Sequence, residues 1–499
     1  MSVTESLTEA FSLRLIVAQV LIAFLSLLVY RRYFSPISDI PGPFFASIGR
    51  LWHTKQIIGR KQSDVLLQLH DELGPFVRIA NNEVSVCHPR GSKEILLNPL
   101  PKDKWYSFFQ IPDYRFDGGM SILEPKRKAE HSKHFASGYA LSNLLKSEDH
   151  MDTNIGSFLD WMDKHAASGE PMDFGLFLTF TANDVLGEVL FSKTFGFLKE
   201  GKDIDNAVRN NHGLALYAAI AGHHWLFMLL HKLFIANPVV TWLNVVPAGH
   251  IMSTAVQWLE HREKNTDARF DMVEHWFKAM REQPDRVSFR QVQCQTTGTI
   301  GGGADTISAG IQSFVYHALR RPSVWARARS EIDDLRAGGL CQDRVVSYAH
   351  TQKLPYLLAC IKEALRIFPP APLGLPRVAP KGGVTIGDRT FPEGTILSIS
   401  PYVVHRSKAL WGEDVNEYKP ERWLSGDTAA LDRNYVAFGL GFNSCPGQHL
   451  ARIEMYKIAA TIVRDYDIRQ VNPDQAWSHD AYFIDCPYDW PVLITKRTL

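Results

Sequence analysis

The stretch that decides the fold reads Phe438-Gly439-Leu440-Gly441-Phe442-Asn443-Ser444-Cys445-Pro446-Gly447. Cys445 lies between Gly441 and Gly447, which allow the backbone to turn tightly. A proline follows it, and apolar residues at helical spacing continue from Leu450, so we expect a helix to start there. A helix N-terminus favours a thiolate, which makes Cys445 a candidate nucleophile or metal ligand. Taken alone, it is more simply a structural cysteine, because buried free cysteines usually just pack.

The composition excludes several classes of protein. The chain has 499 residues, enough for a large core, and its 54 basic against 53 acidic residues give a net charge of +1. This balance provides no field that would attract nucleic acid, and we expect no nucleic-acid partner. Six cysteines are widely scattered without zinc-site spacing, which indicates free thiols in a reducing compartment rather than a disulfide framework.

The N-terminal region predicts a membrane anchor over residues 13–33. Its uncharged part, Leu15 to Tyr30, has 16 residues, somewhat fewer than the about 20 that span a bilayer. Arg31, Arg32 and the tyrosines can extend it at the interface. A cleaved secretory signal is the alternative, but its apolar part would end in small residues. The two arginines predict a lumenal segment 1–12 and a cytoplasmic body.

Residues 34–45 are rich in proline and glycine, which predicts a stiff, non-helical connector before a body over residues 46–499. The body reads as mainly helical with small β-sheets. Alternating apolar residues predict strands at 77–86, and short β-like runs follow at 375–378, 384–391 and 395–400. Aromatic residues are dense in 105–122, where they either cover a core or line an apolar cavity. The apolar stretch 214–251 is either membrane-facing, part of a lid, or core.

A long helix is predicted from about Cys294 to Leu319, and it contains Gly301-Gly302-Gly303-Ala304-Asp305-Thr306. Each glycine costs a helix about 1 kcal/mol relative to alanine, so we expect a group to approach the backbone closely there. Asp305 and Thr306 place an acid and an alcohol beside this thinned surface, a pair that can relay protons. A glycine-rich loop with incidental polar residues is the alternative.

Another helix, from Gln352 to Phe368, carries Glu363 and Arg366 on one face. Most such pairs are weak surface bridges. The apolar neighbours here favour a buried pair, which needs further partners to offset its desolvation.

Four motifs occur in a specific order, and together they resemble the cytochrome P450 family of haem-thiolate monooxygenases. They are Gly302-Gly303-x-Asp305-Thr306, Glu363-x-x-Arg366, Pro420-Glu421-Arg422-Trp423, and Phe438-x-x-Gly441-x-Asn443-x-Cys445-x-Gly447. The resemblance covers residues 36–499 and is closest to membrane-anchored fungal members, including the pisatin demethylase-like group. It implies the mainly α fold with small β-sheets of that family.

The resemblance also implies roles for individual residues. Cys445 would be the axial ligand to the iron of haem b, shielded by Phe438, with Gly441 and Gly447 allowing the loop. Glu363, Arg366 and Arg422 would form a buried network beneath that loop. Asp305 and Thr306 would deliver protons to bound O2. Arg377 and Lys128 would contact the haem propionates.

Two positions depart from the family pattern. Asn443 stands where the family usually has Arg or His paired with a propionate, so that charge pair is missing and haem must rely on other donors. Ile307 stands where a hydroxyl residue usually follows Thr306, and Ser308 is expected to point elsewhere on the helix.

The sequence therefore predicts a monooxygenase in the endoplasmic reticulum membrane that inserts one atom of O2 into an apolar small molecule of terpenoid, polyketide or alkaloid type. Its electrons would come from an NADPH-dependent reductase, with cytochrome b5 as a second candidate donor. Two alternatives stay open. A haem isomerase or dehydratase that needs no O2 is disfavoured by Asp305 and Thr306. A non-catalytic haem-binding membrane scaffold is favoured only by Asn443.

Overall fold

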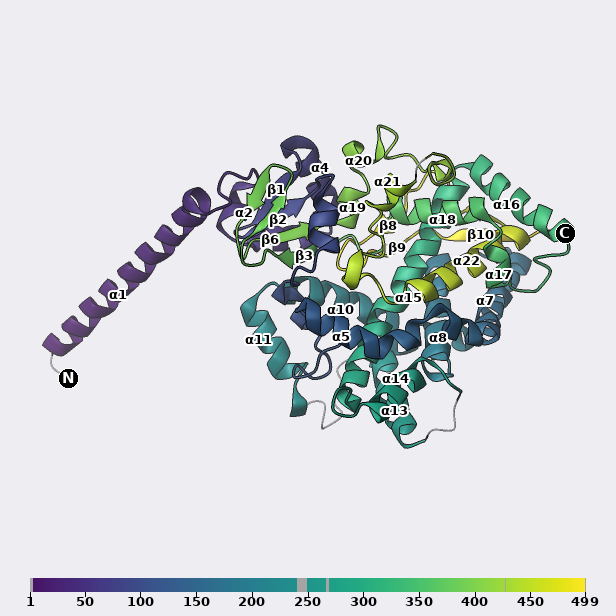
Figure 1. Ribbon diagram of the computed structural model, residues 1–499, viewed down its shortest axis with the longest axis horizontal. Helices are drawn as coiled ribbons and strands as arrows, with labels where there is room; N and C mark the ends of the chain where they lie inside the picture. The colour runs from purple at the N-terminus through teal and green to yellow at the C-terminus, as the bar shows by residue number, and fades with distance from the viewer. Residues whose placement is uncertain (1–2, 240–248, 266–268, 427, 499) are drawn as a thin grey trace.

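The body of the protein is built around one long helix, α15 (Phe289–Leu319), as Figure 1 shows. The computed structural model describes residues 3–239, 249–265, 269–426 and 428–498. Helix α8 (Phe174–Phe191) lies along α15, and a Cβ added at Gly303 would come within 2.8 Å of Leu186 Cδ2. Further along α15, a Cβ added at Gly310 would come within 2.8 Å of Met455 Sδ on α22 (Gln448–Asp465). Small residues therefore bring these helices into close contact with α15.

The remaining described helices surround these three, except α1, which projects away from the body (Figure 1). In chain order they are α1 (Val3–Val29), α2 (Phe44–Ile48), α3 (Leu51–Ile58), α4 (Gln62–Leu73), α5 (Pro125–Phe135), α6 (Leu141–Leu144), α7 (Glu148–Ser168), α9 (Phe197–Glu200), α10 (Ala207–Ala221), α11 (Trp225–Phe234), α13 (Gly249–Lys264), α14 (Met272–Glu282), α16 (Pro322–Ala337), α17 (Tyr348–Thr351), α18 (Pro355–Ile367), α19 (Pro401–Val404), α20 (Lys408–Trp411) and α21 (Ala429–Asp432). Short π turns occur at η1 (Tyr30–Phe34) and η2 (Lys93–Leu97), and short 3-10 turns at η3 (Lys104–Phe109), η4 (Ala136–Tyr139), η5 (Leu145–Ser147), η6 (Ile204–Asn206), η7 (Pro420–Trp423) and η8 (Gly441–Asn443).

A four-stranded sheet lies at the end of the body nearest α1 (Figure 1). Its order is β1 (Phe76–Ala80), β2 (Glu83–Val86), β6 (Ile396–Ile399) and β3 (Leu375–Val378). β2 pairs parallel with β6, and the other two pairings are antiparallel. Three two-stranded sheets complete the fold: β4 (Val384–Ile386) with β5 (Arg389–Phe391), β7 (Tyr466–Gln470) with β10 (Val492–Lys496), and β8 (Ser478–His479) with β9 (Pro487–Tyr488).

These elements confirm the predicted class of a mainly helical fold with small sheets. The strands predicted around 77–86 and after 375 are present, and the run 384–391 is a hairpin rather than one strand. α15 starts five residues before the predicted Cys294, because Ser288 and Gln291 form a capping box at its N-terminus. α18 starts at Pro355 rather than near Gln352.

The N-terminal helix projects away from the body (Figure 1). Leu13–Phe34 is long and apolar enough to cross a membrane, and none of it is buried. α8 passes the same test of composition, but it is 94% buried and is a core helix. The Arg78 guanidinium holds the end of the projecting helix to the sheet, since its Nη2 donates to the backbone oxygens of Arg31, at 2.8 Å, and Ser47, at 3.1 Å. α2 begins at Phe44, so its first two residues are the last two of the predicted connector.

The apolar stretch 214–251 divides into parts with different environments. The end of α10 is buried, for example at Ala218 and Ala221. α11 instead exposes most of its apolar side chains, with Trp225 76% and Phe234 67% exposed. The interpretation of this stretch as core is therefore wrong for α11. Residues 240–248 lie outside the described part of the chain.

Candidate active site

The Cys445 loop is closed by short backbone hydrogen bonds. The Cys445 N–H donates to the Phe438 carbonyl at 2.8 Å, and the Gly439 N–H donates to the Val436 carbonyl at 2.9 Å. The Arg452 guanidinium carbon lies over the Phe438 ring, 5.2 Å from its centroid. The predicted helix, α22, begins three residues after the cysteine, as the proline suggested.

The two glycines flanking Cys445 do not contribute equally. Gly441 has a φ of 65°, and an added Cβ would come within 2.8 Å of the Leu96 carbonyl oxygen. Gly439 has the same positive φ. Gly447 has a φ of −77°, and an added Cβ would meet only the Cys445 sulfur at an ordinary 3.8 Å. The tight turn therefore depends on Gly439 and Gly441. Gly447, which was expected to allow it together with Gly441, has an ordinary backbone conformation.

The N–H groups at the start of α22 favour the Cys445 thiolate, as expected, but they do not decide the net shift of its pKa. Burial raises the pKa of this thiol, and it outweighs the opposing effects of the Gly447 N–H and of the Arg452 and Lys128 charges. A bound metal cation would reverse this balance, since a coordinating thiol is deprotonated.

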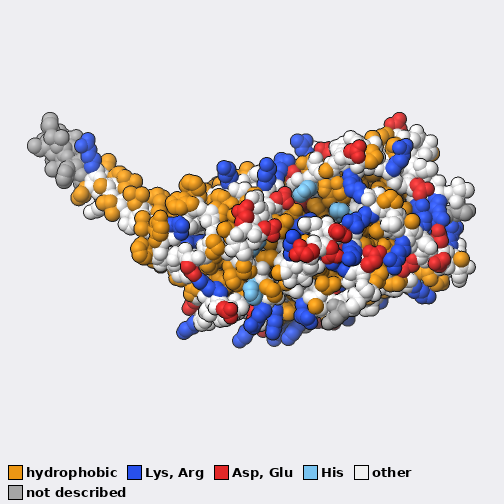
Figure 2. Space-filling view, turned by 90° about the horizontal axis from the view of Figure 1, so that it is seen from above, with side chains coloured by type: hydrophobic (Ala, Val, Ile, Leu, Met, Phe, Trp, Pro, Cys, Tyr) orange, Lys and Arg blue, Asp and Glu red, His pale blue; other side chains and the backbone are white. Residues whose placement is uncertain are grey.

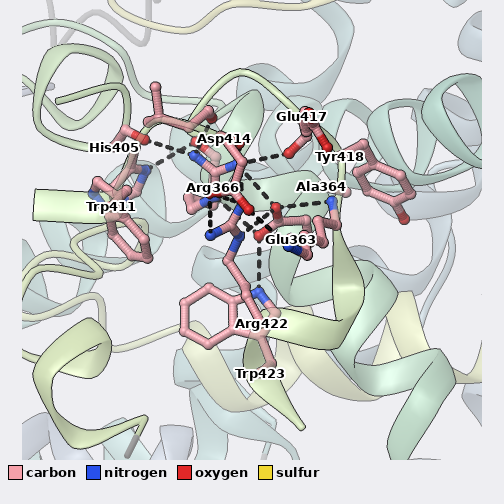
Figure 3. Close-up of polar contacts among 12 residues, drawn as sticks. Glu363, Ala364, Arg366, His405, Trp411, Asp414, Glu417, Tyr418, Arg422 and Trp423 are labelled. Carbon is pink, nitrogen blue, oxygen red and sulfur yellow. Dashed lines mark hydrogen bonds and ion pairs between the residues drawn. The ribbon is translucent and has the colours of Figure 1, made fainter. Parts of the chain in front are cut away.

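The predicted Glu363–Arg366–Arg422 network is present and fully buried around Glu363 (Figure 3). Arg366 donates from Nε and Nη2 to the two Glu363 oxygens at 2.9 Å, and Arg422 Nε donates to Oε1 at 2.9 Å. The Lys419 N–H and the Trp423 indole add two further donors, at 3.0 and 2.9 Å. These donors satisfy the requirement that a buried pair needs additional partners.

His405 connects this network to the Cys445 loop, which the sequence did not predict. Arg366 Nη1 donates to the His405 carbonyl at 2.7 Å (Figure 3), and His405 Nδ1 lies 3.1 Å from the Arg366 carbonyl. The Val436 N–H donates to His405 Nε2 at 2.9 Å. Nε2 must therefore accept and Nδ1 must donate, so this neutral tautomer joins α18 to the start of the loop.

The three glycines of α15 face two environments. Ideal Cβ atoms at Gly301 and Gly302 would meet nothing within 4 Å, whereas Gly303 packs tightly on α8. Gly302 is exposed although it lies midway along the central helix. The surface of α15 is therefore bare at Gly301 and Gly302, and the close approach of another group to it stays a prediction.

Thr306 and Asp305 do not contact each other. The Thr306 hydroxyl donates to the Gly302 carbonyl at 2.8 Å, on the side of the bare surface. Asp305 is buried and points to α10, where Asn211 Nδ2 donates to its Oδ2 at 2.5 Å and His212 Nε2 lies 3.6 Å from its Oδ1. As predicted, Ser308 points elsewhere: it bonds Thr179 of α8 at 2.9 Å.

Asp305, His212 and Cys486 also form a group whose potential ligand atoms lie within 4.8 Å of one another. Such a set could hold a metal ion. The Asn211 amide, however, already donates to one carboxylate oxygen, and the Cys486 thiol donates to the Asp305 backbone carbonyl at 3.6 Å. Hydrogen bonds therefore account for the arrangement without an ion.

Three buried cations lie near one another: Lys102 and Lys128 meet the Gly119–Met120 backbone, and Arg377 lies close enough for its charge to act on Lys102. Lys102 Nζ donates to the Met120 carbonyl at 2.9 Å, Lys128 Nζ lies 3.0 Å from an ideal Cβ at Gly119, and Arg377 donates to the Tyr106 hydroxyl at 3.0 Å. Within the described part of the chain, no ion pair with a carboxylate is recorded for any of the three. Burial lowers the pKa of Lys128 to about 8. Burial and the charges of Lys128 and Arg377 lower the pKa of Lys102 well below its ordinary value.

Two polar side chains near these cations have buried atoms without a hydrogen-bond partner among the described residues. They are Asn443, whose amide oxygen and nitrogen are both buried, and His131, whose two ring nitrogens are buried beside Lys128. Buried polar groups are normally hydrogen-bonded, so orphaned groups indicate a missing partner. Clustered cations, orphaned donors and a nearby thiol suit a ligand that carries both carboxylates and a thiophilic metal.

Sequence reasoning missed Lys102, His131, His405 and the α10 pair Asn211–His212. The resemblance assigned the propionate contacts to Arg377 and Lys128 and gave no role to Lys102. Charged or imidazole residues in otherwise apolar surroundings were a usable signal for Lys102 and His405. The contact of Asn211 and His212 with Asp305 joins residues more than ninety positions apart, and one sequence offers no signal for it.

The comparisons with known proteins agree with this geometry. A family model described as cytochrome P450 matches residues 41–481. A cytochrome P450 monooxygenase of Aspergillus terreus is 30% identical over 489 residues, covering 94% of this chain and 98% of the relative. A pisatin demethylase of Fusarium vanettenii is 28% identical, covering 94% of this chain and 90% of the relative, and the monooxygenase cicH of Emericella nidulans is 29% identical, covering 95% and 97%. The chain therefore belongs to the cytochrome P450 family and is a monooxygenase of the fungal type.

Proposed function

We propose that the protein uses haem b to insert one atom of O2 into an apolar small molecule of fungal secondary metabolism. The observation that carries this proposal is the unbalanced set of buried cations beside the Cys445 loop. Lys102, Lys128 and Arg377 would bind the two haem propionates, and Cys445 would ligate the iron. Asn443 would add a neutral donor in place of the usual charged one. The bound group would supply oxygen activation, and the residues around it would position substrate and protons.

The proximal side would be fixed by the Glu363 network. Arg366 and Arg422 hold Glu363, and His405 carries this rigidity to the Val436–Gly439 turn. Phe438 packs beside the loop and would limit water at the sulfur. On the distal side, Thr306 would hold a proton or a water beside the bare face of α15, with Asp305 as the source of protons.

An apolar substrate is supported by a cluster separate from the main core. Segments 105–122, 214–235, 371–376 and 481–486 meet there, and the contributing residues include Trp105, Phe109, Met120, Leu216, Leu373 and Phe483. Segment 298–306 of α15 joins them through Asp305, whose carbonyl accepts from the Cys486 thiol. Terpenoid, polyketide and alkaloid skeletons all match such an apolar lining, and the cluster does not distinguish them.

Membrane attachment through residues 13–33 is supported by a second apolar surface. Figure 2 shows hydrophobic side chains along the projecting helix and over the adjoining end of the body. α3 exposes Leu51 by 77%, and α11 exposes Trp225. Thr54 and His224 hydrogen-bond at 2.8 Å and join these two helices. We place the protein in the endoplasmic reticulum membrane, with residues 1–12 lumenal, 34–45 as connector and 46–499 on the cytoplasmic side.

Electrons would come from an NADPH-dependent flavoprotein reductase, with cytochrome b5 as a second candidate donor. α5 packs against η8 of the Cys445 loop and presents Lys126, Arg127 and Lys133 to solvent. A basic surface above the proximal side suits a partner with an acidic docking face.

The carbon monoxide difference spectrum of the reduced protein tests the haem-thiolate assignment. We expect the red-shifted thiolate band in the wild type and its loss in Cys445→Ala, because none of the other cysteines belongs to the loop. A wild type without the band would favour the non-catalytic scaffold. Product formed without NADPH and reductase would favour the isomerase or dehydratase. Thr306→Ala should keep the band but release more hydrogen peroxide per NADPH, and unchanged coupling would remove Thr306 from the proton path.

A further inference from the structure

The Asp305 carboxylate is held on the side of α15 away from Thr306. Both of its oxygens are engaged by α10: Asn211 donates to Oδ2, and His212 Nε2 faces Oδ1. The Cys486 thiol holds the backbone carbonyl of the same residue. Adjacent residues on a helix point in different directions, so Asp305 and Thr306 cannot both face the bare surface without a side-chain rotation.

His212 and Asp305 differ sharply in exposure. The side chain of His212 is 47% exposed, whereas that of Asp305 is 3% exposed. The carboxylate therefore needs an intermediary to exchange protons with bulk water. His212 is the titratable side chain that faces both the carboxylate and the solvent in the described residues.

The charges around His212 favour its protonated form. Burial of the ring opposes protonation, but the hydrogen-bonding interaction and charge of Asp305 outweigh it, and Asp480 and Asp203 add smaller attractions, so the pKa of His212 is raised. Cys486 is the other titratable group at this position. Burial, reinforced by the Asp305 and Asp485 charges, raises the pKa of its thiol well above the ordinary value, so it stays neutral.

We propose that His212 is the proton-exchanging residue between solvent and Asp305, and that Asn211 fixes the carboxylate to receive the proton. The inference rests on the proposed monooxygenase function. In the transfer, the Nε2–H bond of the imidazolium breaks and an O–H bond forms at Oδ1. A hydronium ion from the solvent then reprotonates Nε2, leaving water. Neutralised Asp305 no longer attracts the imidazolium, and it turns towards the Thr306 side once the Asn211 amide releases Oδ2.

The distance of 3.6 Å between Nε2 and Oδ1 is longer than a hydrogen bond. Catalytic hydrogen bonds are often long in proteins without bound substrate and shorten in the complex. His212 lies on α10, which also contributes Leu216 to the apolar cluster. Substrate that contacts this cluster would therefore act on the same helix that carries the proton donor.

The first test measures protonation of His212 without turnover. Diethyl pyrocarbonate acylates only neutral imidazole, so the pH midpoint of labelling, read by peptide mass spectrometry on the full-length haem-loaded protein, reports the pKa of each histidine. His261, exposed in the last turn of α13, is the internal reference. We expect His212 to label at a higher midpoint than His261 in the wild type and at the same midpoint in Asp305→Asn. Equal midpoints in the wild type would overturn the ion pair and the proposal.

The second test measures proton delivery. The reconstituted protein with NADPH and reductase, without added substrate, should oxidise NADPH about a hundredfold more slowly in His212→Gln, the lower end of effects seen for a positioned acid. The solvent deuterium isotope effect should rise, and the decline of rate with increasing pH should disappear. His261→Gln should match the wild type.

The outcomes separate this inference from the proposed function. A wild type without the thiolate band or NADPH oxidation would refute the proposed function itself. A normal wild type with His212→Gln equal to His261→Gln in rate and isotope effect would refute only the role of His212. A shifted labelling midpoint without a change in rate would also refute it, because the pair would then be structural.

Discussion

Replacing Glu363 with glutamine tests how much the buried carboxylate charge beneath the Cys445 loop contributes to the free energy of unfolding. Glu363 is fully buried, and five donors converge on its two oxygens: three on Oε1 and two on Oε2. Glutamine keeps only one acceptor oxygen. With its NH2 in place of Oε2, Arg366 Nε and Trp423 Nε1 each lose an acceptor and face another donor.

The expected loss follows from these contacts. Each buried donor left without a partner costs about 1–3 kcal/mol. Removing one member of a buried ion pair costs about 3–5 kcal/mol in total, because the remaining guanidinium charges lose their compensation. We therefore expect Glu363→Gln to lower the free energy of unfolding by about 3–5 kcal/mol, consistent with the sum over two unpaired donors.

The measurement is urea unfolding of the haem-loaded protein followed by tryptophan fluorescence, with the slope m compared between variants. Glu282→Gln is the matched control: its carboxylate is 59% exposed and lies 3.8 Å from Lys278. A pair of this kind contributes less than about 1 kcal/mol. If Glu363→Gln loses no more than the control at unchanged m, the reasoning about a buried charge network is refuted.

Three further substitutions test other parts of the site. Gly441→Ala should destabilise more than Gly426→Ala in urea unfolding, because both have positive φ but only Gly441 also meets a backbone oxygen, that of Leu96, at 2.8 Å; equal losses would show that the close approach is unimportant. Lys102→Met should speed haem transfer to apomyoglobin by about tenfold or more, the value of a lost buried charge contact, and unchanged transfer would remove Lys102 from the propionate site. Burial and neighbouring arginines lower the pKa of His317 to about 3, below its unfolded value, so its contribution is intact above about pH 6.5 and is lost as pH falls. Between pH 7 and 5, His317→Leu should therefore lose about 2 kcal/mol less unfolding free energy than the wild type, and equal losses would contradict a neutral buried imidazole.

Local patterns in the sequence carried most of the fold. Alternating residues such as Val77 and Ile79 predicted a strand, and proline after Cys445 predicted the start of a helix, because these signals act over a few residues. The start of α15 was misplaced although Ser288 and Gln291 form a readable capping box.

Long-range contacts explain what the sequence could not supply. His405 is separated from Arg366 and Val436 by more than thirty positions on either side, and only the fold shows that its two ring nitrogens bridge them. The net shift in the pKa of the Cys445 thiol could not be predicted from the sequence for a related reason. A helix N-terminus is visible in sequence, but the desolvation that outweighs it depends on every element packed around the sulfur.

Charges beneath the Cys445 loop are paired within the chain, whereas the cations beside the loop are not paired with carboxylates among the described residues. This difference links folding to haem binding. Beneath the loop, Glu363 neutralises arginine charge within the chain, so this network is complete as folded. Beside the loop, burial lowers the pKa of Lys102, and the charges of Lys128 and Arg377 lower it further, so their repulsion adds to the cost of burial. Two carboxylates from a ligand would relieve it and stabilise only the folded state. The haem-free protein should therefore have a lower free energy of unfolding than the haem-loaded protein, because its cation cluster lacks carboxylate partners. The Glu363 network should keep the loop in place before haem binds.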